Sequence, residues 1–123
     1  MRSDFSVLAG FEDLILPSML AGGDGSICGL ANVAPDLVVS LVRAVRNGDL
    51  DEAAQLHRQV LSLMTLGSLS DTPLGPIKLA MNVLGVPISP YVRGPALPAS
   101  EEARGKVEGV LREVGLMAMQ ETG

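Results

Sequence analysis

The chain has 123 residues, which is the size of one domain, and its formal net charge is −5. Aromatic residues make up only 2% of the sequence. Together with the acidic balance, this excludes the basic, aromatic surface that nucleic-acid partners require. The single cysteine excludes an internal disulfide bond and any metal site built from several cysteines. Neither a signal-peptide pattern nor a bilayer-length apolar run is present, so we expect a cytoplasmic protein with no membrane partner.

Two short apolar segments near the start of the chain predict parallel strands. Residues 5–8 are apolar and are followed by a glycine, and residues 26–29 form a second apolar run. Between them, residues 12–20 predict a short helix with acidic residues in its first turn, which Pro17 can bend. The order strand, helix, turn, strand predicts a βαβ unit with a right-handed crossover.

Two helices are predicted next along the chain. Pro35 begins the first, and Gly48 follows its last turn as a typical C-terminal glycine. Asp49 and Glu52 have the spacing of a capping box at the start of the second helix. The apolar stripe expected along this second helix is Ala53, Leu56, Val60, Leu61 and Met64.

The last third of the chain alternates between helix and connector. Pro76 is expected to open a helix over residues 77–84 that Gly85 closes. Residues 86–98 hold four prolines, which predicts an extended connector rather than a helix. Ser100 is the expected N-cap of a final helix. The buried positions expected in that helix are Val107, Val110, Leu111 and Val114.

The apolar content of the chain is high for so few elements. Hydrophobic residues make up 47% of the sequence, which is more than two short strands and a few helices are expected to cover. Apolar surface left over in this way usually belongs to an interface. We therefore expect a partner to cover part of this chain.

Two adjacent carboxylates are the first candidates for chemistry. Glu12 and Asp13 follow the first predicted strand, and in a β/α barrel the carboxyl ends of the strands form the active face. The same residues also fit ordinary first-turn charges of a helix, where the helix dipole favours them. The sequence leaves both interpretations open.

The other reactive side chains favour structural roles. Cys28 lies in an apolar strand, where a buried, inert thiol is expected, and His57 lies near an apolar stripe without a second metal ligand. Lys78 and Lys106, the only lysines, lie on helices with polar neighbours and are expected to be solvated or ion-paired. The glycine-rich turn at residues 22–25 precedes a strand, so it fits a tight turn and no phosphate-binding motif.

Several motifs of the chain carry a family resemblance in their order and spacing. Residues 5–10, with Glu12 and Asp13, resemble the seventh strand and following loop of the dihydrodipicolinate synthase and N-acetylneuraminate lyase family. Residues 22–32 resemble its eighth strand. Further motifs resemble its helical C-terminal region, namely residues 48–50 with 53–54, 76–78 with 84–85, and 93–95 with Pro98. The likeness is therefore collinear from Phe5 to Leu116. Residues 8–10 and 28–32 look most like members that cleave keto-deoxy sugar acids or hydroxy-oxoglutarate.

The resemblance implies an α/β fold that is only part of a larger enzyme. Residues 1–48 would be the last two β/α units of a (β/α)8 TIM barrel, and residues 49–123 the C-terminal helical region. As an isolated chain this C-terminal fragment would be α-rich. Members of the family usually assemble as dimers or tetramers.

The resemblance also implies the chemistry of the parent enzyme. Members are class I aldolases, in which a lysine on the sixth strand forms a Schiff base with pyruvate. That lysine, a proton-relaying tyrosine and the loop that binds the pyruvate carboxylate would all precede Met1. The chain is therefore expected to hold no catalytic residue of the family, and no cofactor or metal is expected.

What the resemblance carries over to this chain is the edge of the substrate site. Ile27 matches the residue whose backbone borders pyruvate. Gly10, Glu12 and Asp13 match the loop that contacts the second substrate in the lyase branch. Gly29 stands where that branch has a serine, so one hydroxyl contact is missing.

Three functions are compatible with these expectations. The chain could be a truncated, inactive member of the aldolase family, or a subunit of a split aldolase whose other chain carries the first six strands. It could also be a non-catalytic helical module that kept the oligomerisation surface. The expected partners are accordingly a second copy or the chain with the six strands. A small keto acid would bind only in a complete barrel.

Overall fold

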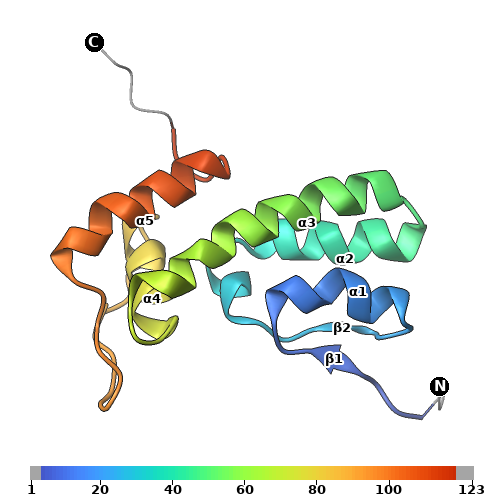
Figure 1. The fold of residues 1–123 in the computed structure, drawn as a ribbon, viewed down its shortest axis with the longest axis horizontal. Coiled ribbons are helices and arrows are strands. Elements are labelled where there is room, and N and C mark those ends of the chain that lie inside the picture. The colour runs from blue at the N-terminus through green and yellow to red at the C-terminus, as the bar shows by residue number, and fades with distance from the viewer. Residues whose placement is uncertain (1–3, 119–123) are drawn as a thin grey trace. The chain divides into compact units, whose positions relative to one another are not determined.

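The computed structural model describes residues 4–118, and Figure 1 shows their elements. Contacts between residues divide the chain into two compact units, Met1–Leu61 and Ser62–Gly123. The structure is rich in helices and has one pair of parallel strands, as the sequence predicts. No helix in this part of the chain is both long enough and apolar enough to cross a membrane.

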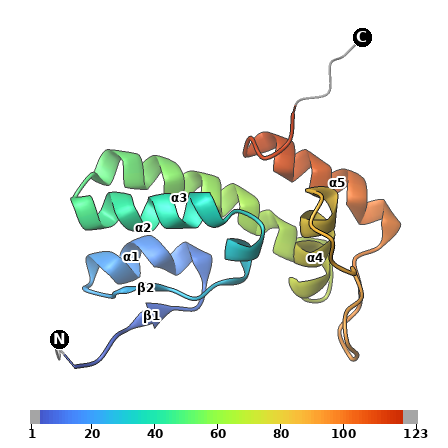
Figure 2. The ribbon, with the colours of Figure 1, turned by 180° about the vertical axis from the view of Figure 1, so that it is seen from behind.

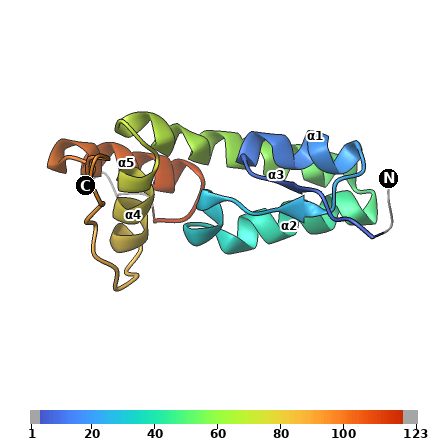
Figure 3. The ribbon, with the colours of Figure 1, turned by 90° about the horizontal axis from the view of Figure 1, so that it is seen from below.

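The first unit begins with the strand pair. Strand β1 (Leu8–Ala9) is followed by the short 3₁₀ helix η1 (Glu12–Leu14), helix α1 (Ile15–Leu20) and strand β2 (Gly25–Ser26). The strands are parallel, with Leu8 opposite Gly25 and Ala9 opposite Ser26. Helix α1 contacts both strands and also α2 (Pro35–Asn47). Figure 1 shows α1 and α2 on the same side of the strand pair, and Figure 3, which views the unit from the strand side, shows the strands in front of both helices.

The strands are shorter than the sequence predicts, and their positions differ from residues 5–8 and 26–29. The amide of Val7 donates to the Oδ2 atom of Asp24, at 2.8 Å, so a side chain takes the place of a ladder partner before β1. Beyond β2, the chain enters the 3₁₀ helix η2 (Gly29–Asn32). Regular pairing is thus confined to two residues of each strand.

The core of the first unit lies between its helices. Helix α2 ends at Gly48, whose φ of 75° is a left-handed conformation that glycine adopts without strain. Asp49 then caps α3 (Leu50–Met64), because its Oδ1 accepts the amide of Glu52 at 3.0 Å. Figure 2 shows α2 and α3 running alongside each other. Their contact belongs to one buried cluster, whose members are Ile15, Met19, Val38, Leu41, Ala44, Ala53 and Val60.

One position of the predicted stripe on α3 is wrong. Leu61 is 42% exposed, whereas Leu63 is fully buried. Successive helical residues are rotated by about 100°, so Leu61 lies a quarter turn beyond Val60 and away from the buried face. Leu63 returns to the side of the helix on which Leu56 packs.

Replacing Leu41 with alanine tests this core. The side chain of Leu41 is completely buried, and its loss removes apolar contacts and leaves a cavity. We expect Leu41→Ala to lower the free energy of unfolding by about 3 kcal/mol. The matched control is Val39→Ala in the same helix, which is 51% exposed and should change little. Urea denaturation at one protein concentration measures both, and equal effects would contradict the assignment of the core.

The second unit contains the 3₁₀ helix η3 (Thr65–Leu69), helix α4 (Leu74–Val83) and helix α5 (Glu101–Glu113). Helix α4 packs against both of the others. It begins three residues before the predicted range of 77–84, so Pro76 is the third residue of the helix and does not precede it. Proline is tolerated throughout the first turn of a helix, because the amides there have no partner within the helix. Val107 and Leu111 of α5 are fully buried, while Val110 and Val114 are half-buried.

The connector at residues 86–98 is free of helix, as predicted, and contacts α4 closely. Lys78 donates from Nζ to the Tyr91 carbonyl at 2.7 Å, and Asn82 donates from Nδ2 to the Ile88 carbonyl at 3.2 Å. Lys78 is half-buried, and its amine bonds to a backbone carbonyl. The sequence predicts a solvated or ion-paired lysine instead. A Cβ atom at Gly75 would lie 2.6 Å from the Ala99 backbone nitrogen, so only glycine permits this approach.

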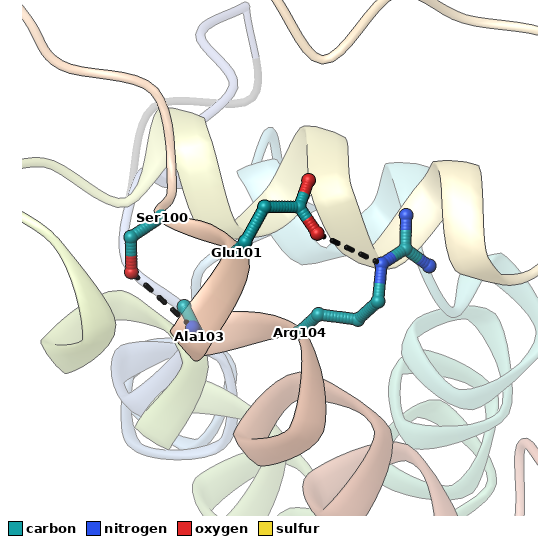
Figure 4. Close-up of polar contacts among 4 residues, drawn as sticks. All are labelled: Ser100, Glu101, Ala103 and Arg104. Carbon is teal, nitrogen blue, oxygen red and sulfur yellow. Dashed lines mark hydrogen bonds and ion pairs between the residues drawn. The ribbon is translucent and has the colours of Figure 1, made fainter.

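Helix α5 starts at the predicted N-cap, which Figure 4 shows in detail. The Oγ atom of Ser100 accepts the amide of Ala103 at 3.3 Å. Glu101 and Arg104 form an exposed ion pair one turn along, with 3.8 Å between Oε2 and Nε. Exposed pairs of this kind contribute little to stability, so the cap is the stronger contact.

Removing the cap provides a test with a conservative control. We expect Ser100→Ala to lower the free energy of unfolding by about 1 kcal/mol, because an amide of the first turn loses its acceptor. Ser100→Asp keeps an acceptor at the same position and should retain most of the stability. Urea titrations measure the free energy of unfolding of each variant. An equal value for Ser100→Ala and for the parent chain would contradict the capping role.

Candidate functional site

The predicted site residues lie in two loops that leave the strand pair at the same end. Gly10, Glu12 and Asp13 follow β1, and Ile27 follows β2. Because β1 and β2 are parallel and in register, both of their carboxyl ends lie at one edge of the sheet. The structure thus brings residues that are 14 or more positions apart in sequence to one edge.

The carbonyl of Ala9 joins the two loops at the end of the ladder. It accepts the amide of Ile27 at 3.0 Å and the Oγ hydroxyl of Ser26 at 2.8 Å. Ser26 is a contact that sequence reasoning missed. In the sequence, Ser26 is only a hydroxyl residue inside an apolar run, and its acceptor cannot be predicted until the opposite strand is known.

The two adjacent carboxylates have different surroundings. Glu12 is buried, at 9% exposure, and its Oε1 accepts the amide of Leu30 at 2.9 Å. Asp13 is exposed. Both also lie in the first turn of η1, where the dipole favours negative charge. The loop therefore directs one carboxylate into the protein and leaves the other available to solvent.

The remaining site residues present backbone and apolar surface. Ile27 is 74% exposed and Gly10 is exposed as well. A Cβ atom at Gly10 would meet nothing within 4 Å, so the surface beside the glycine is open. Phe11, next to Gly10, is another exposed large apolar residue. This edge can contact a small molecule or another protein segment, and the two lysines of the chain belong to other elements, α4 and α5.

A groove of about 550 Å³ lies elsewhere in the first unit, between the strands and α2. Its lining includes Leu8, Val38, Val42 and Arg43, and none of the four predicted site residues. Arg46 closes one side of it, because its Nη2 donates to the Asp24 carbonyl at 2.7 Å. Asp24 precedes β2, so this side of the groove lies at the start of the strand rather than at its carboxyl end.

The other reactive side chains do not assemble into a second site. Within residues 4–118, no group of three His, Cys, Asp or Glu residues could hold a metal ion. Cys28 is half-buried in the extended segment after β2, not in a strand as predicted. His57 is half-buried, and its Nδ1 has no hydrogen-bond partner. Lys106 is exposed on α5.

Comparison with known proteins identifies the family. The sequence pattern of the dihydrodipicolinate synthetase family matches residues 1–114. The chain belongs to this family. The prediction made from its motifs is confirmed, and the match extends through the strand pair and the helices of both units.

Individual members of the family are similar over nearly the whole chain. A probable 2-dehydro-3-deoxy-D-pentonate aldolase of Escherichia coli is 42% identical over 95% of this chain and 39% of its own length. A 4-hydroxy-tetrahydrodipicolinate synthase of Moorella thermoacetica is 38% identical over 94% of this chain and 39% of its own length. The crystal structure of an E. coli prophage protein of the family, in complex with pyruvate, aligns with a TM-score of 0.83 and 36% identity. That alignment covers 92% of this chain and 38% of the prophage protein.

The chain thus spans about two fifths of the length of the curated relatives that it matches. The relatives are aldolases and synthases, which supports an aldolase-type function at the level of the family. The shared part is the strand pair with its two loops and the helices that follow.

Proposed function

We propose that the chain is the C-terminal part of a pyruvate-dependent Schiff-base aldolase with a (β/α)8 barrel. Residues 1–48 would supply the last two β/α units, and residues 49–123 the C-terminal helical region. Membership in the family over residues 1–114 supports this assignment, as does the parallel pairing of β1 and β2. Parallel strands joined by a helix are the repeating unit of such barrels.

The observation that carries the proposal is the junction of the two loops at the carboxyl edge. The Ala9 carbonyl, at the end of β1, accepts the amide of Ile27 in the second loop, and the Glu12 carboxylate of the first loop accepts the amide of Leu30. In barrel enzymes this edge forms the active face. The backbone at Ile27 would border the keto acid, and Gly10, Glu12 and Asp13 would lie on the side of the second substrate.

The chain would contribute binding surface, whereas the amine would come from the rest of the barrel. In the reaction, a lysine amine attacks the keto carbon and water leaves, and the resulting imine withdraws electrons from the bond that is cleaved. Neither lysine of this chain is suited to that role. Lys78 donates to a backbone carbonyl, and Lys106 is exposed on a helix.

The proposed substrate class is a 2-keto-3-deoxy sugar acid, which aldol cleavage would convert to pyruvate and an aldehyde. The support is the relative that is 42% identical and is described as a probable 2-dehydro-3-deoxy-D-pentonate aldolase. The serine-to-glycine difference at Gly29 removes one hydroxyl contact, so a second substrate with fewer hydroxyl groups is the better fit.

The partner required by this proposal is a polypeptide with the first six strands. The exposure of Phe5, Phe11 and Ile27 favours it, because large apolar side chains around a strand pair are normally covered. A split aldolase, in which that polypeptide is a separate chain, is therefore the second candidate. The two arrangements share the same completed site.

A completed barrel tests the proposal. Residues 4–118 would replace the matching part of the E. coli pentonate aldolase relative, and the chimera would be incubated with pyruvate and borohydride. We expect a pyruvyl adduct on a lysine in the relative's portion, together with pyruvate release from 2-dehydro-3-deoxy-D-pentonate. Mixing the two portions as separate chains tests the split arrangement. A chimera with the parent enzyme's circular dichroism but without adduct would overturn the proposal and favour a non-catalytic helical module.

A further inference from the structure

We propose that Glu12 is a positioning residue that fixes the backbone of residues 27–30, the segment that borders the keto acid. This inference deepens the proposed function and rests on it. Its basis is the hydrogen bond from the Leu30 amide to Glu12 Oε1, at 2.9 Å, in a buried setting. Glu12 would thus act through the second loop rather than by touching the substrate.

The segment after β2 is held at its near end by the last residue of β1 and at its far end by a side chain of the first loop. At the near end, the amide of Ile27 donates to the Ala9 carbonyl at 3.0 Å. At the far end, the amide of Leu30 donates to Glu12. The residues between these points have no strand partner, because β2 ends at Ser26. Without the second contact, the segment would be tied to the strand pair at one point only.

The start of η2 explains why a side chain is needed at this place. The first amides of a helix have no partner within it, and a preceding side chain usually accepts one of them. Cys28 occupies the capping position of η2, and its side chain makes no such hydrogen bond. Glu12 therefore supplies the acceptor from the other loop, and the Asn32 side chain closes the turn by donating to the Gly29 carbonyl at 3.1 Å.

Burial makes this contact strong and makes Glu12 a poor substrate ligand. A carboxylate taken from water must be hydrogen-bonded to be tolerated, and bonds to a charged acceptor are about twice as strong as neutral ones. At 9% exposure, Glu12 is directed toward η2, whereas its neighbour Asp13 remains exposed. The two adjacent carboxylates therefore differ in role, because Glu12 acts between the two loops whereas Asp13 stays on the surface.

The test compares Glu12→Ala with Glu12→Gln. The glutamine keeps an oxygen that can accept the Leu30 amide, and the alanine does not. In the chimera described above, we expect Glu12→Ala to raise the half-saturating pyruvate concentration for borohydride trapping about tenfold, with little loss at saturation. We expect Glu12→Gln to stay within about threefold of the parent, because a neutral acceptor retains part of the bond. Asp51→Ala, an exposed acid on α3, is the matched control.

A second measurement separates this inference from the proposed function. Amide hydrogen exchange at Leu30 is measured in the 123-residue chain itself, where Glu12→Ala should accelerate it at least tenfold relative to Asp51→Ala. Unchanged exchange at Leu30 would overturn the positioning role even if the parent chimera traps no pyruvate. Faster exchange with an unchanged half-saturating pyruvate concentration would overturn it too. A parent chimera that traps no pyruvate, with faster exchange at Leu30, would refute the proposed function alone.

Discussion

The isolated 123-residue chain is expected to form no covalent adduct when it is incubated with pyruvate and borohydride. Imine formation at useful rates needs an amine held in a dry pocket beside the pyruvate carboxylate, which raises its effective concentration by orders of magnitude. The amine of Lys78 is instead bonded to the Tyr91 carbonyl, at 2.7 Å. Lys106 lies exposed on α5, where its amine is open to water.

Mass spectrometry of the reduced chain is the measurement. We expect the unmodified mass under conditions in which the E. coli relative, treated in parallel, gains one pyruvyl group per chain. Lys78→Arg and Lys106→Arg identify the position of any adduct that does appear. A stoichiometric adduct that either variant abolishes would contradict the prediction.

We expect the isolated chain to associate at micromolar concentrations. Among the described residues, the sheet has two strands, so each strand has one edge without a strand neighbour. Such edges pair readily with other chains, and a two-stranded sheet is marginal by itself. Phe5, Phe11 and Ile27 add exposed apolar surface close to these edges. At about 25 cal/mol per Å², covering about 400 Å² of such surface would contribute about 10 kcal/mol to association.

Light scattering coupled to size exclusion measures the association. We expect Ile27→Lys to shift the chain toward the monomer, because the side chain is 74% exposed and the charge would oppose burial. Leu97→Lys in the second unit is the matched control, since Leu97 is 61% exposed but lies in the connector. A parent chain that elutes as a monomer, melts cooperatively and binds no apolar dye would contradict the prediction.

The helix boundaries show what could be predicted from the sequence. Gly48, Asp49 and Ser100 each end or begin a helix as expected. The reason is that capping contacts join residues within four positions of each other, so the sequence contains both partners. Family membership could be predicted for a related reason, because it depends on motifs in a fixed order and not on contacts between them.

The strand limits and the role of Glu12 could not be predicted in this way. The ladder stops before β1 because the Asp24 side chain takes the Val7 amide, 17 positions away. Glu12 turns inward because the Leu30 amide, 18 positions away, has no other acceptor from its own turn. Neither pairing leaves a local pattern, because each depends on which group the fold places opposite.

The sequence by itself determined the α-helices, the presence of a parallel strand pair, the caps of three helices and the family. The tertiary structure decided which of two adjacent carboxylates is buried, which residues of α3 and α5 form the core, and which carbonyl accepts the hydrogen bond of Lys78. Local contacts join residues that are close in the sequence, so the sequence predicts them. Burial and long-range hydrogen bonds follow from the packing of segments that are far apart in the chain, so only the folded arrangement reveals them.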